Sequence, residues 1–208
     1  MLAPGAARHL LPVVLLLLLA VLTGVVAGGT VAIAAGLVAA ALAALVAFLA
    51  VFFRDPERTP GDGIVSAADG TVRAVERSGE RWTISVFLGP LNVHVNRLPI
   101  GGTVEAIAEA GRGFRPAFRP EAASNAARSY RLRTEIGPVE VIQIVGVVAR
   151  RLVSFVRVGA TLRKGERFGM ILLGSRVDVL LPAERVEPTV RVGDRVRAGA
   201  STIARIRP

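Results

Sequence analysis

Two long apolar runs near the amino end constrain the fold of this chain more than any other feature. They cover Leu10–Ala27 and Thr30–Phe53, and neither contains a charged residue. About 20 apolar residues in a helix suffice to cross the hydrocarbon core of a bilayer. Two glycines separate the runs; Arg8 precedes the first run, and Arg54 and Arg58 follow the second. The sequence therefore predicts a two-helix transmembrane hairpin over residues 1–53, with both ends at the cytoplasmic face of the cell membrane.

A cleavable signal peptide is the alternative for the first run. Arg8 precedes an apolar core that ends in Val25-Val26-Ala27, which resembles a cleavage site. The second run is longer and follows at once, which favours the hairpin. Hydrophobic residues make up 52% of the chain, too many for an ordinary soluble domain alone.

The part that follows the apolar runs, residues 54–208, is polar and basic. The net charge of the whole chain is +10, and no acidic residue precedes Asp55. Because this basic domain is attached to a membrane hairpin, we expect the anionic surface of the membrane to be its partner. Nucleic acid is not expected, because only 5% of the residues are aromatic and no basic run is interleaved with rings. The absence of cysteine and the presence of only two histidines predict no disulfide and no metal site.

Short runs of alternating apolar and polar residues, separated by glycine or proline, predict a mainly β soluble domain over residues 54–208. The segment Gly111–Arg133 is rich in Arg, Ala and Pro, and is expected to be a surface loop. One internal repeat is visible, because Val156–Gly165 and Val190–Gly199 share the pattern V-R-V-G-x-x-[LV]-R-x-G. Paired hairpins of this kind are typical of barrel-sandwich-like domains, some of which carry a modified lysine. Lys164 in the first copy corresponds to Ala198 in the second, which favours a scaffold over a carrier.

Three short motifs hold the residues that could do chemistry. They are ADG with Asp69, NVHVNR with His94, and LGSR with Ser175. A serine hydroxyl becomes a nucleophile when a histidine removes its proton and a carboxylate orients that histidine. Each residue also has a structural interpretation: a turn aspartate, a half-buried strand histidine and a serine at a bulge. The residues alone thus predict a candidate Ser-His-Asp site on a β domain tethered to a membrane, and they leave open a membrane-tethered serine hydrolase and a non-catalytic lipid-bound β scaffold.

The same motifs resemble the phosphatidylserine decarboxylase family, in particular its short, archaetidylserine-decarboxylase-like branch. The resemblance covers most of the chain after Val51, in five stretches that occur in order: FFRDPER at 52–58, SAADGTV at 66–72, GPLNVHVNRLP at 89–99, VARRLVSFV at 148–156 and GERFGMILLGSRVDVLLP at 165–182.

This resemblance implies a proenzyme that cuts itself at the Gly174-Ser175 bond. Ser175, activated by His94 with Asp69 behind it, would attack the carbonyl group of Gly174. The products would be a β chain, residues 1–174, and an α chain, residues 175–208, which stay together as a heterodimer; a higher oligomer is left open. Ser175 would become a pyruvoyl group, the only cofactor, and His94 would return a proton after CO2 leaves. The implied reaction converts phosphatidylserine, or a related serine phospholipid, to phosphatidylethanolamine in phospholipid biosynthesis.

Overall fold

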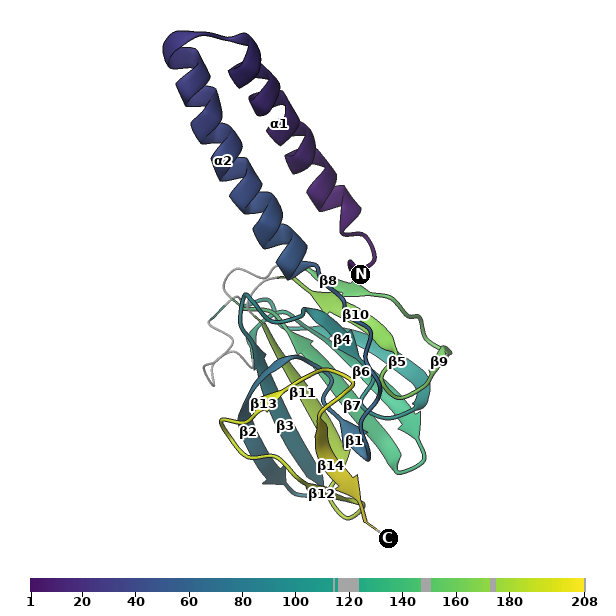
Figure 1. The fold of residues 1–208 in the computed structure, drawn as a ribbon. Coiled ribbons are helices and arrows are strands. Elements are labelled where there is room, and N and C mark those ends of the chain that lie inside the picture. Colours follow the sequence, from purple (N-terminus) through teal and green to yellow (C-terminus); the bar gives the residue numbers. More distant parts are fainter. Residues whose placement is uncertain (114, 116–123, 147–150, 173–174, 208) are drawn as a thin grey trace. The chain divides into compact units, whose positions relative to one another are not determined.

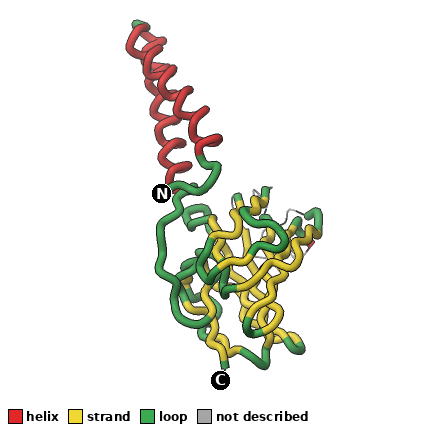
Figure 2. The backbone as a smooth tube through the Cα atoms, turned by 90° about the vertical axis from the view of Figure 1, so that its right-hand side faces the viewer, coloured by secondary structure: helices red, strands yellow, loops and turns green. Residues whose placement is uncertain are grey.

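The computed structural model describes residues 1–113, 115, 124–146, 151–172 and 175–207. The chain divides into two compact units, Met1–Pro56 and Glu57–Pro208. The first unit is helical and the second consists of strands and loops (Figures 1 and 2). The helices and strands are α1 (Ala7–Val26), α2 (Gly29–Phe52), β1 (Ile64–Val65), β2 (Gly70–Ser78), β3 (Arg81–Leu88), β4 (Val95–Arg97), β5 (Gly102–Ala110), β6 (Ala127–Thr134), β7 (Gly137–Ile144), β8 (Leu152–Ser154), β9 (Thr161–Leu162), β10 (Arg167–Ile171), β11 (Ser175–Pro182), β12 (Val186–Pro188), β13 (Arg195–Val196) and β14 (Thr202–Ile206).

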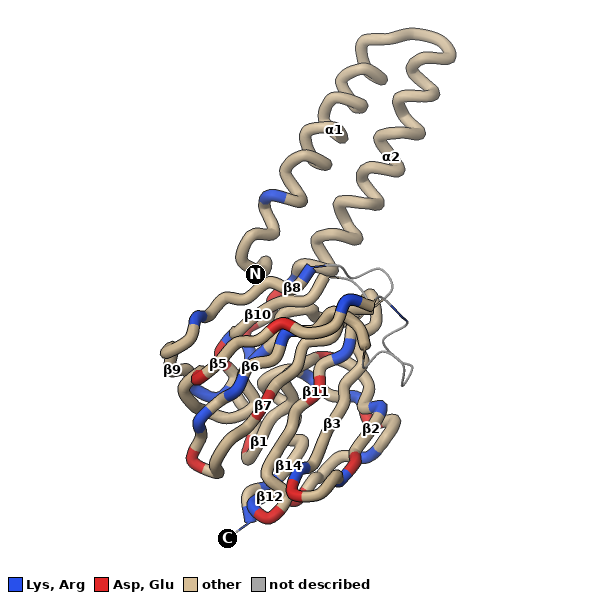
Figure 3. Tube along the Cα trace, turned by 180° about the vertical axis from the view of Figure 1, so that it is seen from behind, with Lys and Arg blue, Asp and Glu red and all other residues tan. Residues whose placement is uncertain are grey.

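The helical unit is a pair of apolar helices that pack against each other along their length (Figure 1). Both are long and apolar enough to cross a membrane, and the 24 residues of α2 span about 36 Å. Small residues lie where the helices meet: a Cβ on Gly24 would lie 3.6 Å from that of Ala35. Arg8 is the only charged side chain in either helix (Figure 3). The prediction of two apolar helices is therefore confirmed.

The β unit is built around one eight-stranded sheet with the order β13-β2-β3-β11-β7-β6-β5-β9. Two three-stranded sheets, β1-β14-β12 and β4-β10-β8, complete it. Alternate residues of β11 face the core, including Val177 and Val179, and they pack with Phe168 of β10 and Ile203 of β14 in one apolar cluster. The predicted mainly β domain is confirmed, and β11 occupies the middle of the large sheet, between β3 and β7.

The internal repeat forms the two edges of this sheet. The first copy contributes β9, which pairs with β5, and the second contributes β13, which pairs with β2. The turn glycines make equivalent bonds: Gly159 N donates to Val104 O, and Gly193 N donates to Val72 O. The copies are thus related scaffold elements at opposite edges, whereas the finer prediction of a barrel-sandwich is not confirmed.

The prediction that Gly111–Arg133 is a loop is wrong for its last part. Strand β6 begins at Ala127 and pairs with β5 on one side and β7 on the other. Its buried residues, Tyr130 and Leu132, alternate with exposed arginines. The abundance of arginine concealed this alternation in the sequence. Residues 114 and 116–123 lie outside the described part of the chain.

Candidate active site

Ser175 is the first residue of β11 and is fully buried. It pairs with Leu88, the last residue of β3, so its backbone is held by the middle of the sheet. Its hydroxyl oxygen has no hydrogen-bond partner among the described residues. An unsatisfied buried hydroxyl costs roughly 1–3 kcal/mol, which is unusual for a residue with only a structural role. Gly174, the other half of the predicted cleavage site, lies outside the described residues.

His94 is fully buried and directly precedes β4. Its Nδ1 atom lies 2.8 Å from the carbonyl oxygen of Asn92. A carbonyl oxygen only accepts hydrogen bonds, so in the neutral ring Nδ1 carries the proton and Nε2 carries the lone pair. The carbonyl oxygen of His94 accepts a bond from Ile171 N at 3.2 Å. Ile171 ends β10, four residues before Ser175, so His94 is fastened to the segment that leads to the predicted cleavage site.

Asp69 is buried and takes part in a polar cluster with Arg58. The guanidinium of Arg58 binds both carboxylate oxygens, with Nη2 at 2.9 Å from Oδ2. The amide of Ala198 donates to Oδ1 at 2.8 Å, and the carbonyl oxygen of Ala198 accepts from Arg58 Nη1. The carboxylate is therefore bound to Arg58 and Ala198, while the Nδ1 atom of His94, which a triad aspartate would bind, is bound to Asn92.

Asp69 and Ser175 nevertheless lie at the same end of the large sheet. Ser175 pairs with Leu88 of β3, and β2, on the other side of β3, begins at Gly70, directly after Asp69. A Cβ on Gly70 would lie 1.9 Å from the carbonyl oxygen of Phe87, so only glycine fits beside β3 here. Two strand spacings, about 10 Å, separate β2 from β11.

Two residues of this site were missed by the sequence reasoning. Arg58 was interpreted as one of the basic residues that flank the apolar runs. Its position after Glu57, within the FFRDPER stretch, was the signal that could have assigned it to the soluble domain. Asn92 orients His94 through its backbone carbonyl group, for which no residue type in the sequence is a signal. Its side chain also accepts a hydrogen bond from Gly89 N at 2.8 Å, which stabilises the turn between β3 and His94.

Asp178 forms a largely buried ion pair with Arg176 on the face of β11 opposite the core, and the two side chains are 10% and 15% exposed. The Nη2 atom of Arg176 donates to Asp178 Oδ2 at 3.0 Å. Burial raises the pKa of the Asp178 carboxyl above its ordinary value, and the charge of Arg176 only partly offsets this. Asp178 therefore lies three residues from Ser175 but on the opposite face of β11, where burial disfavours the charged form of its carboxyl group.

Replacing Asp178 by asparagine is expected to change how stability depends on pH. With a raised folded pKa, the unfolded chain ionises Asp178 first as the pH rises, so the native chain loses stability between the ordinary pKa and the raised one. The free energy of unfolding of Asp178→Asn, measured with urea in detergent, should therefore increase relative to the native chain across this interval. Glu184→Gln removes an acid that is 74% exposed and serves as the control without this trend. A difference that stays constant with pH would contradict the assignment.

Comparisons with known proteins agree on one family. The family profile described as phosphatidylserine decarboxylase matches residues 45–204. A phosphatidylserine decarboxylase proenzyme of Thermobifida fusca is 47% identical over 161 residues, which cover 76% of this chain and 74% of the relative. One from Streptomyces coelicolor is 46% identical over 157 residues, 74% of this chain and 71% of the relative. A candidate archaetidylserine decarboxylase proenzyme of Halobacterium salinarum is 43% identical over 163 residues, 76% of this chain and 81% of the relative.

Proposed function

The chain belongs to the phosphatidylserine decarboxylase family, and from this premise we propose that it decarboxylates phosphatidylserine, or a related serine phospholipid, after cutting itself between Gly174 and Ser175. The relatives are named proenzymes of this activity, which supports an enzyme that matures from a precursor. The two other classes, a serine hydrolase and a non-catalytic scaffold, receive no support from these relatives.

The observation that carries the proposal is the buried, unpartnered hydroxyl group of Ser175. Ser175 Oγ is the nucleophile, and it attacks the carbonyl carbon of Gly174 as its proton moves to a base. The peptide bond to Ser175 then becomes an ester; loss of the Cα proton and of the Cβ–Oγ bond frees the upstream chain with a carboxylate at Gly174. Water then displaces the nitrogen of the resulting dehydroalanine as ammonia and leaves a pyruvoyl group. The large sheet holds β11 on both sides, between β3 and β7, so the new amino end stays in place.

His94 is the base that we assign to this step. The bond between Nδ1 and the carbonyl oxygen of Asn92 favours the tautomer whose Nε2 can accept a proton. Its carbonyl oxygen is bound to Ile171, which supports a position close to the cleaved bond. The same ring, once protonated, can return a proton at the end of decarboxylation. A positioned acid or base of this kind contributes about 10²- to 10⁴-fold in rate.

Asp69 acts, in this proposal, with Arg58 as a charged anchor beside the site. Their ion pair and the bond from Ala198 join the chain before β2 to the segment after β13. Residues on both sides of the predicted cut therefore share one carboxylate. The anchor keeps the future α and β chains in register around Ser175.

A pyruvoyl group derived from Ser175 fits the position that this residue occupies. The surroundings offer the hydroxyl hydrogen no acceptor among the described residues. In the pyruvoyl group a methyl group stands where Ser175 has its hydroxymethyl group, so the donor that the site does not satisfy is lost, and the keto oxygen is bonded to Cα in place of the nitrogen. Such a group would supply an electron-accepting carbonyl for the loss of CO2.

A lipid substrate is found in the membrane, and the two apolar helices support a membrane location for this protein. We infer that α1 and α2 cross the bilayer as a hairpin and place the basic β unit at the cytoplasmic, anionic leaflet of the cell membrane. A polybasic domain gains about 1 kcal/mol per well-placed basic residue at such a surface.

The proposal is tested by mass spectrometry and a CO2 assay on the purified full-length chain. We expect two polypeptides, residues 1–174 and 175–208, the smaller blocked at its amino end and lighter than an unmodified peptide because its nitrogen is lost as ammonia. Membranes that hold this protein should release labelled CO2 from phosphatidylserine labelled in its serine carboxyl group. An intact single chain that decarboxylates would refute self-cutting, and a correctly cut chain that releases no CO2 from any serine phospholipid would refute the activity.

A further inference from the structure

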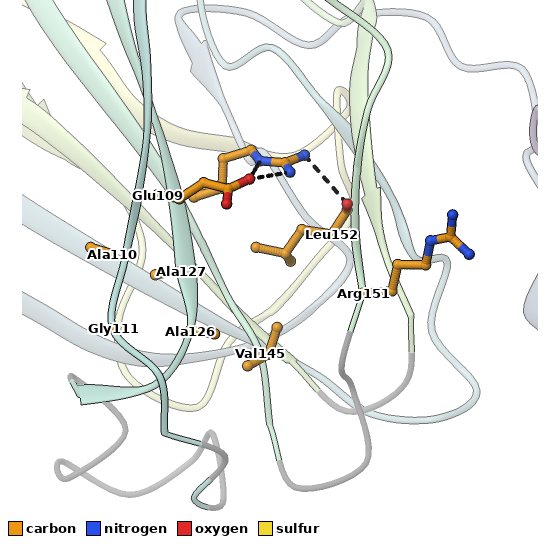
Figure 4. A pocket seen from close by; sticks show the side chains of 9 residues that line it. Glu109, Ala110, Gly111, Ala126, Ala127, Val145, Arg151 and Leu152 are labelled. Carbon is orange, nitrogen blue, oxygen red and sulfur yellow. Dashed lines mark hydrogen bonds and ion pairs between the residues drawn. The ribbon is translucent and has the colours of Figure 1, made fainter.

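A pocket of about 260 Å³ opens at the same end of the large sheet as Ser175. It lies where β5 ends and β6 begins, and Val145 and Leu152 form its apolar walls (Figure 4). Small residues also line it, namely Ala110, Gly111, Ala126 and Ala127. At Gly111 the backbone leaves no room for a side chain. Gly111 has a φ of +68°, and a Cβ there would lie 2.0 Å from the carbonyl oxygen of Asn125.

The strand register relates this pocket to Ser175. Arg128 of β6 pairs with Gln143 of β7, and Gln143 pairs with Val177 of β11. Residues that pair directly lie on the same face of a sheet, as do residues two apart in one strand. Arg128, Gln143, Val177 and Ser175 therefore share the core-facing side. Two strand spacings and two residues separate the Cα atoms of Arg128 and Ser175, about 12 Å.

Val145 lies between the pocket and the candidate active site. It directly follows Ile144, which pairs with Arg176. Because the two strands are antiparallel, Val145 lies opposite Ser175. It also lines the pocket, and its amide donates to the carbonyl oxygen of Ala126 at 3.0 Å. The pocket is thus the next space along this face from Ser175, one strand away.

Arg128 and Arg151 line this pocket among the described residues, and the guanidinium of Arg128 is held from two sides. Nε and Nη2 donate to Glu109 Oε1 at 3.2 and 2.5 Å, and Nη1 donates to the carbonyl oxygen of Leu152 at 3.3 Å (Figure 4). The side chain of Arg151, by contrast, points away from Glu109 and Leu152 in Figure 4. The Arg128 side chain is 18% exposed, whereas that of Glu109 is 72% exposed. An ion pair with so exposed a carboxylate is weak, so another anion can replace it.

We propose that this pocket holds the phosphodiester group of the serine phospholipid and that Arg128 binds it; this assignment rests on the proposed function. The amine and the carboxylate of the head group sit on one carbon and must both lie at residue 175. The phosphorus atom is four covalent bonds from the amine nitrogen, roughly 5 Å. A long arginine side chain covers the remaining distance, and a planar guanidinium matches two phosphate oxygens.

Binding of soluble head groups to the uncut Ser175→Ala chain in detergent tests this proposal without any catalysis. The probes are glycerophosphoserine and glycerophosphoethanolamine, and the readout is calorimetry. Arg128→Gln should weaken both probes about 10- to 100-fold, because a charged hydrogen-bond partner is lost. Arg131→Gln is the matched control: Arg131 lies on the same strand, faces the opposite side and is exposed. It should leave both affinities unchanged.

A gain of affinity provides a result that misfolding cannot imitate. Glu109→Gln removes the anion that competes for Arg128, so both probes should bind a few-fold more tightly. Unchanged or weaker binding to Glu109→Gln would overturn the proposal. Arg128→Gln affinity equal to that of its parent would also overturn it. The proposal would also be overturned if Arg128→Gln lost glycerophosphoserine binding but kept glycerophosphoethanolamine binding. Arg128 would then bind the serine carboxylate and not the phosphodiester.

Activity separates this proposal from the proposed function. In the chain that carries Ser175, Arg128→Gln should raise KM for phosphatidylserine with little change in kcat and with complete chain cutting. If the native chain releases no CO2 but the probes still depend on Arg128, the pocket stands and the decarboxylase function fails. If the native chain decarboxylates and Arg128→Gln has the same KM, only the pocket assignment fails.

Discussion

Replacing Ser175 by alanine is expected to leave the protein as one uncut chain and to reduce CO2 release from phosphatidylserine to background. The loss should exceed about 10³-fold, because the residue serves both as nucleophile for cutting and as precursor of the cofactor. The variant should still fold, since Ser175 makes no side-chain hydrogen bond with the described residues. Gel electrophoresis reports the cutting, and labelled phosphatidylserine reports the activity.

A matched serine and a chemical probe complete this test. Ser78→Ala changes an exposed serine at the end of β2 and should cut and decarboxylate like the native chain. A fluorophosphonate probe should not label mature native enzyme, because no hydroxyl group remains at position 175. Strong labelling of a fully active protein would show a serine hydrolase instead, and decarboxylation by Ser175→Ala would refute the role of this residue.

Replacing His94 by alanine should slow chain cutting about 10²- to 10⁴-fold, the usual contribution of a positioned base. Precursor then accumulates, and its conversion can be followed over hours on a gel after synthesis. His9, the only other histidine, lies in α1, so His9→Ala provides the control and should cut at the native rate.

Because His94 is buried, its replacement could slow cutting by disturbing the fold. A second measurement therefore tests proton transfer directly. His94→Gly leaves space for a small base, and added imidazole should restore part of the cutting if His94 transfers the proton. His94→Gln keeps a polar side chain of similar size and should remain slow. Native cutting rates in His94→Gln, or no effect of imidazole together with a native-like circular dichroism spectrum, would exclude His94 as the base.

The helices and most strands could be predicted because their signals are local. An uncharged run of about 20 residues has few alternatives to an apolar helix, and the alternation in β3 and β7 is regular. Strand β6 escaped prediction because three of its eight residues are arginines, while only Tyr130 and Leu132 are deeply buried. The repeat was recognised, but its assignment to hairpins of one barrel-sandwich was not confirmed, because β9 and β13 pair with strands far away in the sequence.

The candidate site illustrates the same limit at the level of side chains. Ser175, His94 and Asp69 stand out by residue type, and the strands bring Ser175 and Asp69 to one end of the sheet. The partners that orient them do not stand out, because Asn92 acts through its backbone and Arg58 was attributed to the membrane boundary. Arg128 escaped attention for a third reason: it lay in a segment taken for a loop, so its position on the core-facing side of β6 was invisible.

The position of β11 in the middle of the sheet has a thermodynamic consequence for a cut protein. Once the bond before Ser175 is broken, the native state is a complex of two polypeptides: the smaller supplies β11 and β13 to the large sheet, and its β12 and β14 form a sheet with β1 of the larger. Unfolding then also separates them, so it becomes a bimolecular equilibrium whose midpoint rises with protein concentration. Dilution would destabilise the mature protein but not its precursor, which retains the covalent link.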